Sequence, residues 1–301
     1  MRGRQVTGLE GVTTDSGGIE SAHTGRPITM KKVIASLIGC LMITGCVASK
    51  PGAPGGTTVE ATAPLPADQL VFAVDFSGMS DYQAYVADAT GLAIYGDGRV
   101  YRLIDTKAGQ RVAATYEIGQ LDPMDVAEFA ATATQSGLLE PDTGYGEVHG
   151  VQDAGGIAVT LHDKGEPLRV SVYAPDSDSG VTLTQGRNRK KLLELADAAK
   201  QLADTAQFAP ATIDHVQVVQ TRPWNTTAPE WPGPDPATFL APIMGSSFGL
   251  GCGTLSGSEA AKVLAAAAQN DSTYHWMVNG QPTVLVVRPL LPGEEACDKV
   301  T

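Results

Sequence analysis

Apolar and polar residues alternate in several short runs of this chain, the pattern of strands with one buried face. Residues 157–161 and 168–173 both alternate in this way, with a Lys-Gly turn between them, and predict a β-hairpin. A second hairpin is predicted for residues 92–95 and 99–104. Its turn contains Asp97-Gly98, two residue types that tolerate the positive φ of a tight turn.

A helical period follows the hairpin of residues 92–104. Asp122 is the expected N-cap and Pro123 the first helical residue, because proline has no N–H to satisfy there. Gly137 fits the C-terminal stop. A second helix is predicted for about residues 188–205, with Leu192, Leu195, Ala199 and Leu202 on its apolar face.

A third helix is predicted for about residues 257–269, where Ser256 and Glu259 have the spacing of a capping box. Further strands are predicted at residues 70–76, 112–118, 213–221, 274–278 and 283–288. Pro210 marks a boundary between two folded parts. The fold class expected is α+β: antiparallel hairpins with helices on one face in residues 69–208, and a smaller βαββ unit in residues 209–301.

The segment before the folded parts has a different pattern. Lys31 and Lys32 precede an apolar run of eleven residues, 33–43, and small residues stand before Cys46. A short basic region, an apolar stretch and a small-residue cleavage site are typical of a secretory signal, and the run is too short to span a bilayer. Residues 30–45 are therefore predicted to be a signal peptide.

Ile43-Thr44-Gly45-Cys46 resembles the lipobox of bacterial lipoproteins. The resemblance implies cleavage after Gly45 and a diacylglycerol on the sulfur of Cys46, and so a lipid bilayer as partner at the outer face of the cytoplasmic membrane. Cys40 ends a similar motif, but too few apolar residues separate it from Lys32. Residues 1–29 are interpreted as a non-native or disordered extension before a start at Met30.

Residues 46–68 are rich in Pro, Gly, Thr and Ala without a helical period, which is typical of a flexible tether. The chain is acidic, with a formal net charge of −12. A negative surface repels phosphate backbones, so nucleic acid is not an expected partner. It also argues against binding to anionic lipid without an anchor, whereas two acyl chains would make attachment stable.

The chain has four cysteines. If Cys40 is removed with the signal and Cys46 carries lipid, Cys252 and Cys297 remain in an exported protein, where thiols oxidise readily. We therefore predict a Cys252–Cys297 disulfide. The alternative, a pair of metal-binding thiolates, lacks a CxxC motif or a nearby histidine pair.

Several motifs resemble those of a family of uncharacterised exported lipoproteins of actinobacteria. They are Ala93–Val100 (AIYGDGRV), Leu121–Asp125, Val170–Tyr173, Cys252–Gly257 and Arg288–Cys297 (RPLLPGEEAC). The resemblance covers most of residues 70–301. It implies an envelope location and the paired cysteines, but no catalytic residue.

No catalytic residue, metal site or cofactor is predicted. The chain has no G-x-S-x-G nucleophile motif. His149, His162, His215 and His275 lack the spacing that would place two imidazoles on one face of a helix or strand.

One segment favours a binding role. The Pro-rich residues 222–236 contain Trp224 and Trp231, and exposed tryptophans commonly anchor proteins or sugars. The alternative is that both indoles pack back over the sheet. The function expected is thus a binding or scaffolding module of the envelope, whose partner is an envelope protein or glycan.

Two other functions stay open. An envelope hydrolase could use acidic residues of the 140–156 loop, namely Asp142, Glu147 and Asp153, if two carboxylates lie close together and one has a raised pKa. The protein could also be a purely structural lipoprotein.

Overall fold

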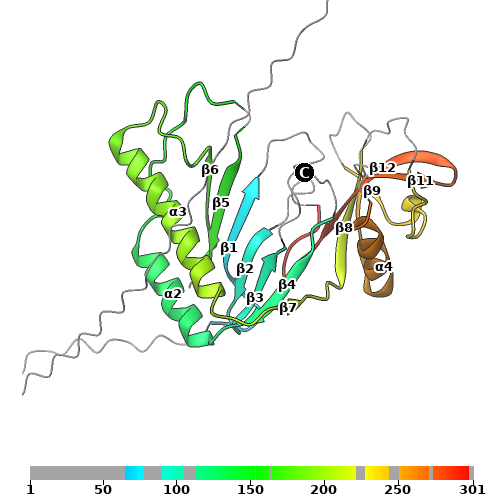
Figure 1. The fold of residues 1–301 in the computed structure, drawn as a ribbon, viewed down its shortest axis with the longest axis horizontal. Helices are drawn as coiled ribbons and strands as arrows, with labels where there is room; N and C mark the ends of the chain where they lie inside the picture. The colour runs from blue at the N-terminus through cyan, green and yellow to red at the C-terminus, as the bar shows by residue number, and fades with distance from the viewer. Residues whose placement is uncertain are drawn as a thin grey trace, which may run out of the picture. The chain divides into compact units, whose positions relative to one another are not determined.

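A computed structural model describes residues 65–77, 90–104, 113–152, 154–162, 165–221, 228–243, 251–270 and 274–297. These residues form two antiparallel sheets, of seven and five strands, and three α-helices (Figure 1). The predicted α+β class is confirmed. The described residues from Leu65 onward belong to one compact unit, Thr58–Thr301.

The first sheet has the strand order β6-β5-β1-β2-β3-β4-β7. Its strands are β1 (Leu70–Ser77), β2 (Thr90–Tyr95), β3 (Arg99–Leu103), β4 (Tyr116–Gln120), β5 (Gly156–Leu161), β6 (Leu168–Tyr173) and β7 (Ala209–Pro210). Both predicted hairpins, β2–β3 and β5–β6, are present. Gly98 takes a φ of +87° in the turn between β2 and β3, as the Asp-Gly pair predicted.

Two helices cover one face of this sheet (Figure 1). Helix α2 (Pro123–Gln135) starts as predicted, because the side chain of Asp122 accepts a hydrogen bond from the N–H of Met124 at 2.8 Å. Helix α3 (Leu183–Ala203) starts earlier than the predicted residue 188. Thr182 and Gln185 form a capping box there, a signal that the apolar period alone did not reveal.

The core of the first sheet lies between the strands and the two helices. Apolar side chains that alternate along the strands meet the buried face of α3, which comprises Arg189, Leu192, Ala196, Ala199 and Ala203. The opposite face packs a cluster of tyrosines and Ala93 against Leu291. Both faces are therefore partly covered, one by helices and the other by the segment after the last strand.

The second sheet has the order β11-β12-β8-β10-β9. Its strands are β8 (His215–Thr221), β9 (Ala241–Pro242), β10 (Gly251–Ser256), β11 (His275–Val278) and β12 (Gln281–Pro289), and helix α4 (Gly257–Ala267) packs on one face. Strand β10 was not predicted, because glycine is uncommon in strands and two of its six residues are glycine. Gly253 is required there, since a Cβ would lie 2.3 Å from the carbonyl oxygen of Phe239.

The predicted capping box of α4 is wrong. Ser256 occupies the N-cap position, but its side chain makes no capping hydrogen bond. It is still the last paired residue of β10, opposite His215, so the helix follows the strand without a loop. The predicted start of the helix at Gly257 is therefore correct, although the capping box on which the prediction was based does not form.

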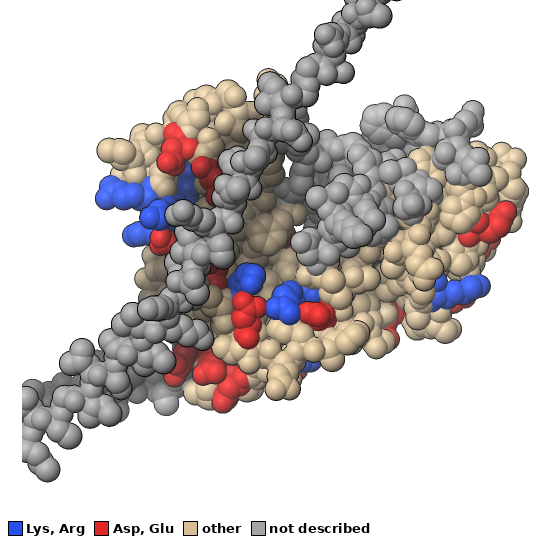
Figure 2. Space-filling model, viewed as in Figure 1, with Lys and Arg blue, Asp and Glu red and all other residues tan. Residues whose placement is uncertain are grey.

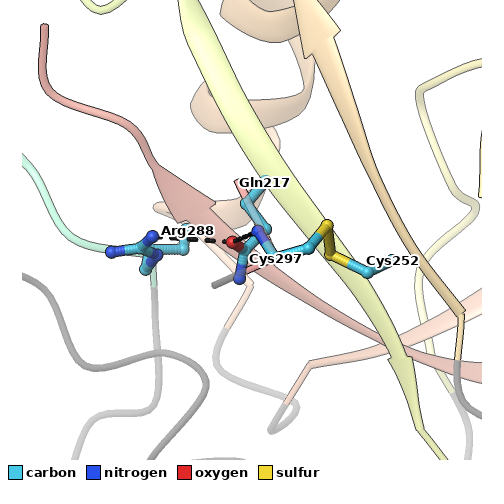
Figure 3. Close-up of a disulfide and its surroundings, with 4 residues drawn as sticks. All are labelled: Gln217, Cys252, Arg288 and Cys297. Carbon is cyan, nitrogen blue, oxygen red and sulfur yellow. Dashed lines mark hydrogen bonds between the residues drawn. A yellow bond between two sulfur atoms is a disulfide. The ribbon is translucent and has the colours of Figure 1, made fainter. Parts of the chain in front are cut away.

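The predicted disulfide is confirmed: Cys252 on β10 is bonded to Cys297 after β12 (Figure 3). The N–H of Cys297 donates to Oε1 of the buried Gln217 on β8 at 2.6 Å. The disulfide therefore attaches Cys297 to β10, and the hydrogen bond attaches it to the neighbouring strand β8.

Candidate functional site

Three adjoining cavities lie along one side of α3. Their volumes are about 280, 490 and 510 Å³, and Leu193 lines all three. We call them the inner, middle and outer cavities, and together the α3 furrow. They follow the helix from Lys200, which lines the inner cavity, to Leu183, which lines the outer one.

The inner cavity lies between α3 and the helix-covered face of β1, β2, β3 and β5. Most of its lining is apolar: Val74, Leu92, Leu103, Ile157, Leu193 and Ala196. Alternation along the strands directs Val74, Leu92 and Ile157 toward the helices, whereas the side chain of Leu103 packs with the tyrosine cluster on the opposite face. An apolar pocket with a few polar groups is the usual form of a small-molecule site.

Phe76 joins the inner and middle cavities, because it lines both. It is 58% exposed, an unusual environment for a large apolar side chain at the end of a strand. Its ring lies over Gly91 of the neighbouring strand, where a Cβ would be only 2.7 Å from the ring. Glycine at this position therefore gives the ring its place beside the furrow.

The middle cavity is bordered by the start of β5 and by the loop after β6. In that loop Ala174 has a φ of +44°, a left-handed conformation that costs free energy for a residue with a Cβ. The N–H of Ala174 donates to the carbonyl of Gly155 at 2.8 Å. Strained backbone held by its surroundings is often found beside a binding site.

Arg189 holds this loop in place from inside the protein. Its guanidinium donates to the carbonyls of Tyr145 at 3.0 Å, Gly146 at 3.2 Å and Ala174 at 2.6 Å, and also to that of Tyr173. The side chain is only 1% exposed, and burial lowers its pKa while Asp178 opposes that shift. A buried cation thus connects α3 to the loop after β6, which lines the middle cavity, and to Tyr145 and Gly146 in the segment before β5.

The two basic residues that line the inner cavity, Arg102 and Lys200, are paired with carboxylates that do not line it. Arg102 forms ion pairs with Glu117 at 2.8 Å and Asp204 at 2.9 Å, and Lys200 pairs with Asp204 at 3.0 Å. Lys200, and then Arg102, lower the pKa of Asp204. Asp197 is exposed. In Figure 2, basic and acidic side chains are interspersed on the visible face, with no large area of one sign.

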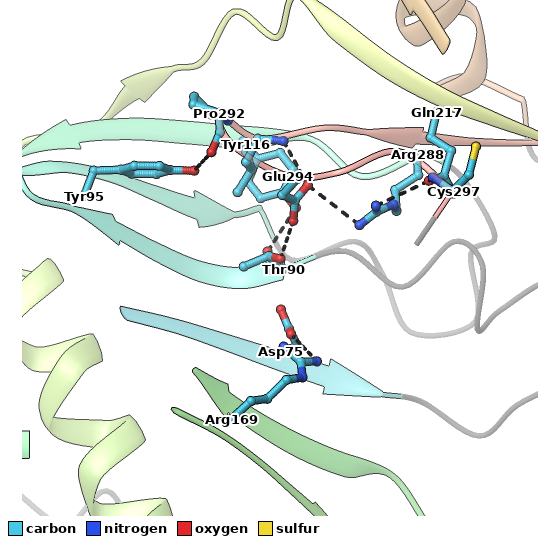
Figure 4. A network of polar contacts seen from close by, with 11 residues as sticks. Asp75, Thr90, Tyr95, Tyr116, Arg169, Gln217, Arg288, Pro292, Glu294 and Cys297 are labelled. Atoms are coloured by element: carbon cyan, nitrogen blue, oxygen red, sulfur yellow. Dashed lines mark hydrogen bonds and ion pairs between the residues drawn. The ribbon is translucent and has the colours of Figure 1, made fainter. Parts of the chain in front are cut away.

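A separate polar network lies on the opposite face of the first sheet (Figure 4). The carboxylate of Glu294 accepts from Oγ1 of Thr90 at 2.8 Å and from the N–H of Leu291 at 2.9 Å, and lies 3.7 Å from Arg288. The hydroxyl of Tyr116 donates to the carbonyl of Thr90 at 3.0 Å. Burial, and then Glu294, raise the pKa of Tyr116 well above its usual value.

The same network includes the hydroxyl of Tyr95, which donates to the carbonyl of Pro292 at 2.7 Å, and the ion pair of Asp75 with Arg169 at 2.9 Å. None of the cavities of the α3 furrow is lined by Glu294 or Tyr116. The contacts of this network are internal, and its clearest effect is to attach residues 290–297 to the first sheet.

Trp231 is packed within the second part of the fold. Its ring lies edge-on to the buried Trp276 with centroids 5.2 Å apart, and its indole N–H donates to the carbonyl of Pro234 at 2.8 Å. Trp224 lies outside the described residues. A partner-binding role for the two tryptophans stays a prediction, but the indole N–H of Trp231 already has an internal acceptor.

The structure describes two of the three acidic residues named in the 140–156 loop. Asp142 and Glu147 are both exposed, and Asp153 lies outside the described residues, as does Cys46. Within the part of the chain that is described, no three His, Cys, Asp or Glu side chains are placed to hold a metal ion. In the same residues, no helix has the length and apolar character needed to cross a membrane.

No family model, curated protein or solved structure matches this chain. The resemblance to exported actinobacterial lipoproteins therefore rests on the sequence motifs alone. It stays a prediction, and the folded part has to be interpreted from its own geometry.

The sequence did not indicate the furrow. Its lining comes from strand ends, loops and a helix that are far apart along the chain, and Leu193 was not on the predicted apolar face of α3. The sequence could have shown that Arg189 is buried. It is three residues before Leu192 and seven before Ala196, which places it on the same face of the helix. A charged residue at a core position of a helix is a signal of a buried polar contact.

Proposed function

We propose that this protein is a lipid-anchored binding module on the outer face of the cytoplasmic membrane, and that its ligand occupies the α3 furrow. The observation that supports binding is the furrow itself: apolar side chains line adjoining cavities beside a strained loop that Arg189 holds. The anchor is supported by the lipobox-like motif at Cys46. The tether of residues 46–68 would separate the folded part from the membrane surface.

The anchor is tested with two cysteine variants. Cys46→Ser should release the protein from washed membranes, because no sulfur remains to carry the diacylglycerol. Cys40→Ser is the matched control and should leave the protein in the membrane fraction. Release by Cys40→Ser, or membrane retention of Cys46→Ser, would contradict the assignment.

Binding is tested by native mass spectrometry of the protein purified from its own membranes. A non-covalent adduct should be present in the wild type. It should be lost in Ala196→Leu, which fills the inner cavity, and kept in Ala198→Leu, which changes an exposed position of the same helix. An adduct that is equal in both variants, or absent from the wild type, would contradict ligand binding in the furrow.

A further inference from the structure

The geometry points to one ligand class for the α3 furrow: a single unbranched aliphatic chain, with its end in the inner cavity. This inference rests on the proposed function and makes it more specific. It follows from the chemistry of the lining, from the form of the three cavities and from the state of the neighbouring charges.

The lining of the inner cavity offers contacts to hydrocarbon and few to polar groups. Leu92, Ile157 and Leu193 present aliphatic surface. A peptide in the same place would bring N–H and C=O groups, and each one left without a partner costs about 1–3 kcal/mol. A hydrocarbon chain has no such groups, so apolar burial alone stabilises it there.

The charged side chains nearby are already engaged. Arg102 has two carboxylate partners, and Lys200 shares one of them. An anionic head group in the inner cavity would have to compete with Asp204 and Glu117 for these cations. The inner cavity therefore favours the apolar end of a ligand over its head.

The form of the furrow favours a long, thin ligand. The cavities share Leu193 and follow α3 from Lys200 to Leu183, a distance of about 25 Å at the rise of an α-helix. The inner cavity, of about 280 Å³, is the smallest of the three. Because Phe76 lines both the inner and the middle cavity, a thin chain beside its ring would contact both, whereas a fused-ring ligand would not follow the adjoining cavities.

The outer cavity does not select the sign of a head group. Arg187 and Lys190 line it together with Asp176 and Asp178. Lys190 also lies 3.8 Å from Glu194, and the guanidinium of Arg187 donates to the carbonyl of Leu183 at 3.3 Å. Because both signs are present, we expect the chain rather than the head to determine affinity.

The test uses the full chain carrying Cys46→Ser, so that its own predicted acyl chains do not compete. trans-Parinaric acid, an unbranched chain whose conjugated double bonds make it fluorescent, is bound first and then displaced by linear alkanols from hexanol to dodecanol. Each added methylene should tighten displacement about fourfold, until the chain outgrows the inner cavity. Affinity that does not change with chain length would overturn the proposal, as would equal displacement by bulky adamantylmethanol and linear decanol.

Head-group dependence is measured with decanol, decanoate and decyltrimethylammonium. The three should bind within about tenfold of one another, because the rim carries both signs. A preference of a thousandfold for either charged head would show that an ionic site, and not the chain, determines binding. It would likewise contradict the proposal.

Two variants locate the chain. Ala196→Leu should weaken displacement by decanol at least about tenfold, and Ala198→Leu should not. Because Ala196 is nearly buried and its variant could lose stability, Phe76→Ser at an exposed position provides a second test. It should also weaken binding while the thermal unfolding midpoint stays within a few degrees. Unchanged affinity in a folded Ala196→Leu or in Phe76→Ser would overturn the proposal.

The experiments distinguish failure of the aliphatic ligand from failure of the furrow as a binding site. If alkanols do not bind but a native adduct is lost only in Ala196→Leu, the furrow binds a ligand of another class. If neither the alkanols nor a native adduct depends on Ala196, the furrow is not a binding site, and the proposed function fails with the aliphatic ligand.

Discussion

Thr90 and Glu294, 204 residues apart, are joined by a hydrogen bond of 2.8 Å from the threonine hydroxyl to the carboxylate. Thr90 begins β2 of the first sheet, whereas Glu294 follows β12, the longest strand of the second. The same carboxylate accepts from the N–H of Leu291 and faces the buried Arg288. One side chain therefore connects the two sheets and also fixes the turn after β12.

Glu294→Gln should lower the free energy of unfolding by about 1–3 kcal/mol, since it removes the charge beside a buried guanidinium. Urea denaturation followed by fluorescence measures the change. Glu295→Gln is the matched control. Glu295 is the next residue in the chain and is exposed, so this substitution should have almost no effect on the free energy of unfolding. Equal midpoints for the two variants would show that Glu294 does not stabilise the contact.

The disulfide should stabilise the same region from its other end. Cys252 and Cys297 are separated by 45 residues, and closing a loop of this length contributes about 4 kcal/mol in the chain-entropy model. The double variant Cys252→Ser/Cys297→Ser should therefore unfold at lower urea concentration. It should also speed hydrogen exchange at residues 290–296, which Cys297 anchors. A loss of stability without faster exchange there would show that other contacts hold the segment.

Local patterns in the sequence predicted most of the elements that are stabilised locally. The Asp97-Gly98 turn, the Asp122 cap and the alternation of residues 157–161 each depend on neighbours a few residues away. Failures occurred where distant contacts decide. Strand β10 contains Gly253, and the reason for a glycine in this strand is apparent only once the backbone of Phe239 lies against it.

The candidate site was less accessible than the fold for the same reason. Phe76, Leu193 and Ala174 come from a strand, a helix and a loop, and their proximity is a property of the tertiary structure. The cysteine pair was an exception, because redox chemistry by itself restricts which thiols of an exported chain can pair. Sequence reasoning therefore found the covalent link but not the cavities.

Arg189→Met should release the loop after β6. The substitution keeps similar bulk but leaves the carbonyls of Tyr145, Gly146 and Ala174 without their donor, which we expect to cost about 3 kcal/mol. Hydrogen exchange should increase in residues 174–177, which line the middle cavity, and in residues 144–146. Arg187→Met, on the exposed side of the same helix, should change neither stability nor exchange. Unaltered exchange in Arg189→Met would mean that other contacts hold Ala174.

Stability at alkaline pH should show that the pKa of Tyr145 is higher than that of an ordinary tyrosine. Burial raises the pKa of Tyr145 to about 12, and its hydroxyl donates to the carbonyl of Leu138. Because the folded pKa exceeds the unfolded value of about 10, the stabilising contribution is complete below pH 10 and is lost as the pH rises through about 12. Wild-type protein should therefore lose more stability than Tyr145→Phe over this interval, as measured by urea denaturation at each pH. Tyrosinate absorbance of protein unfolded in urea gives the reference titration near pH 10. Parallel stability curves for the two proteins would show that Tyr145 ionises normally in the folded state.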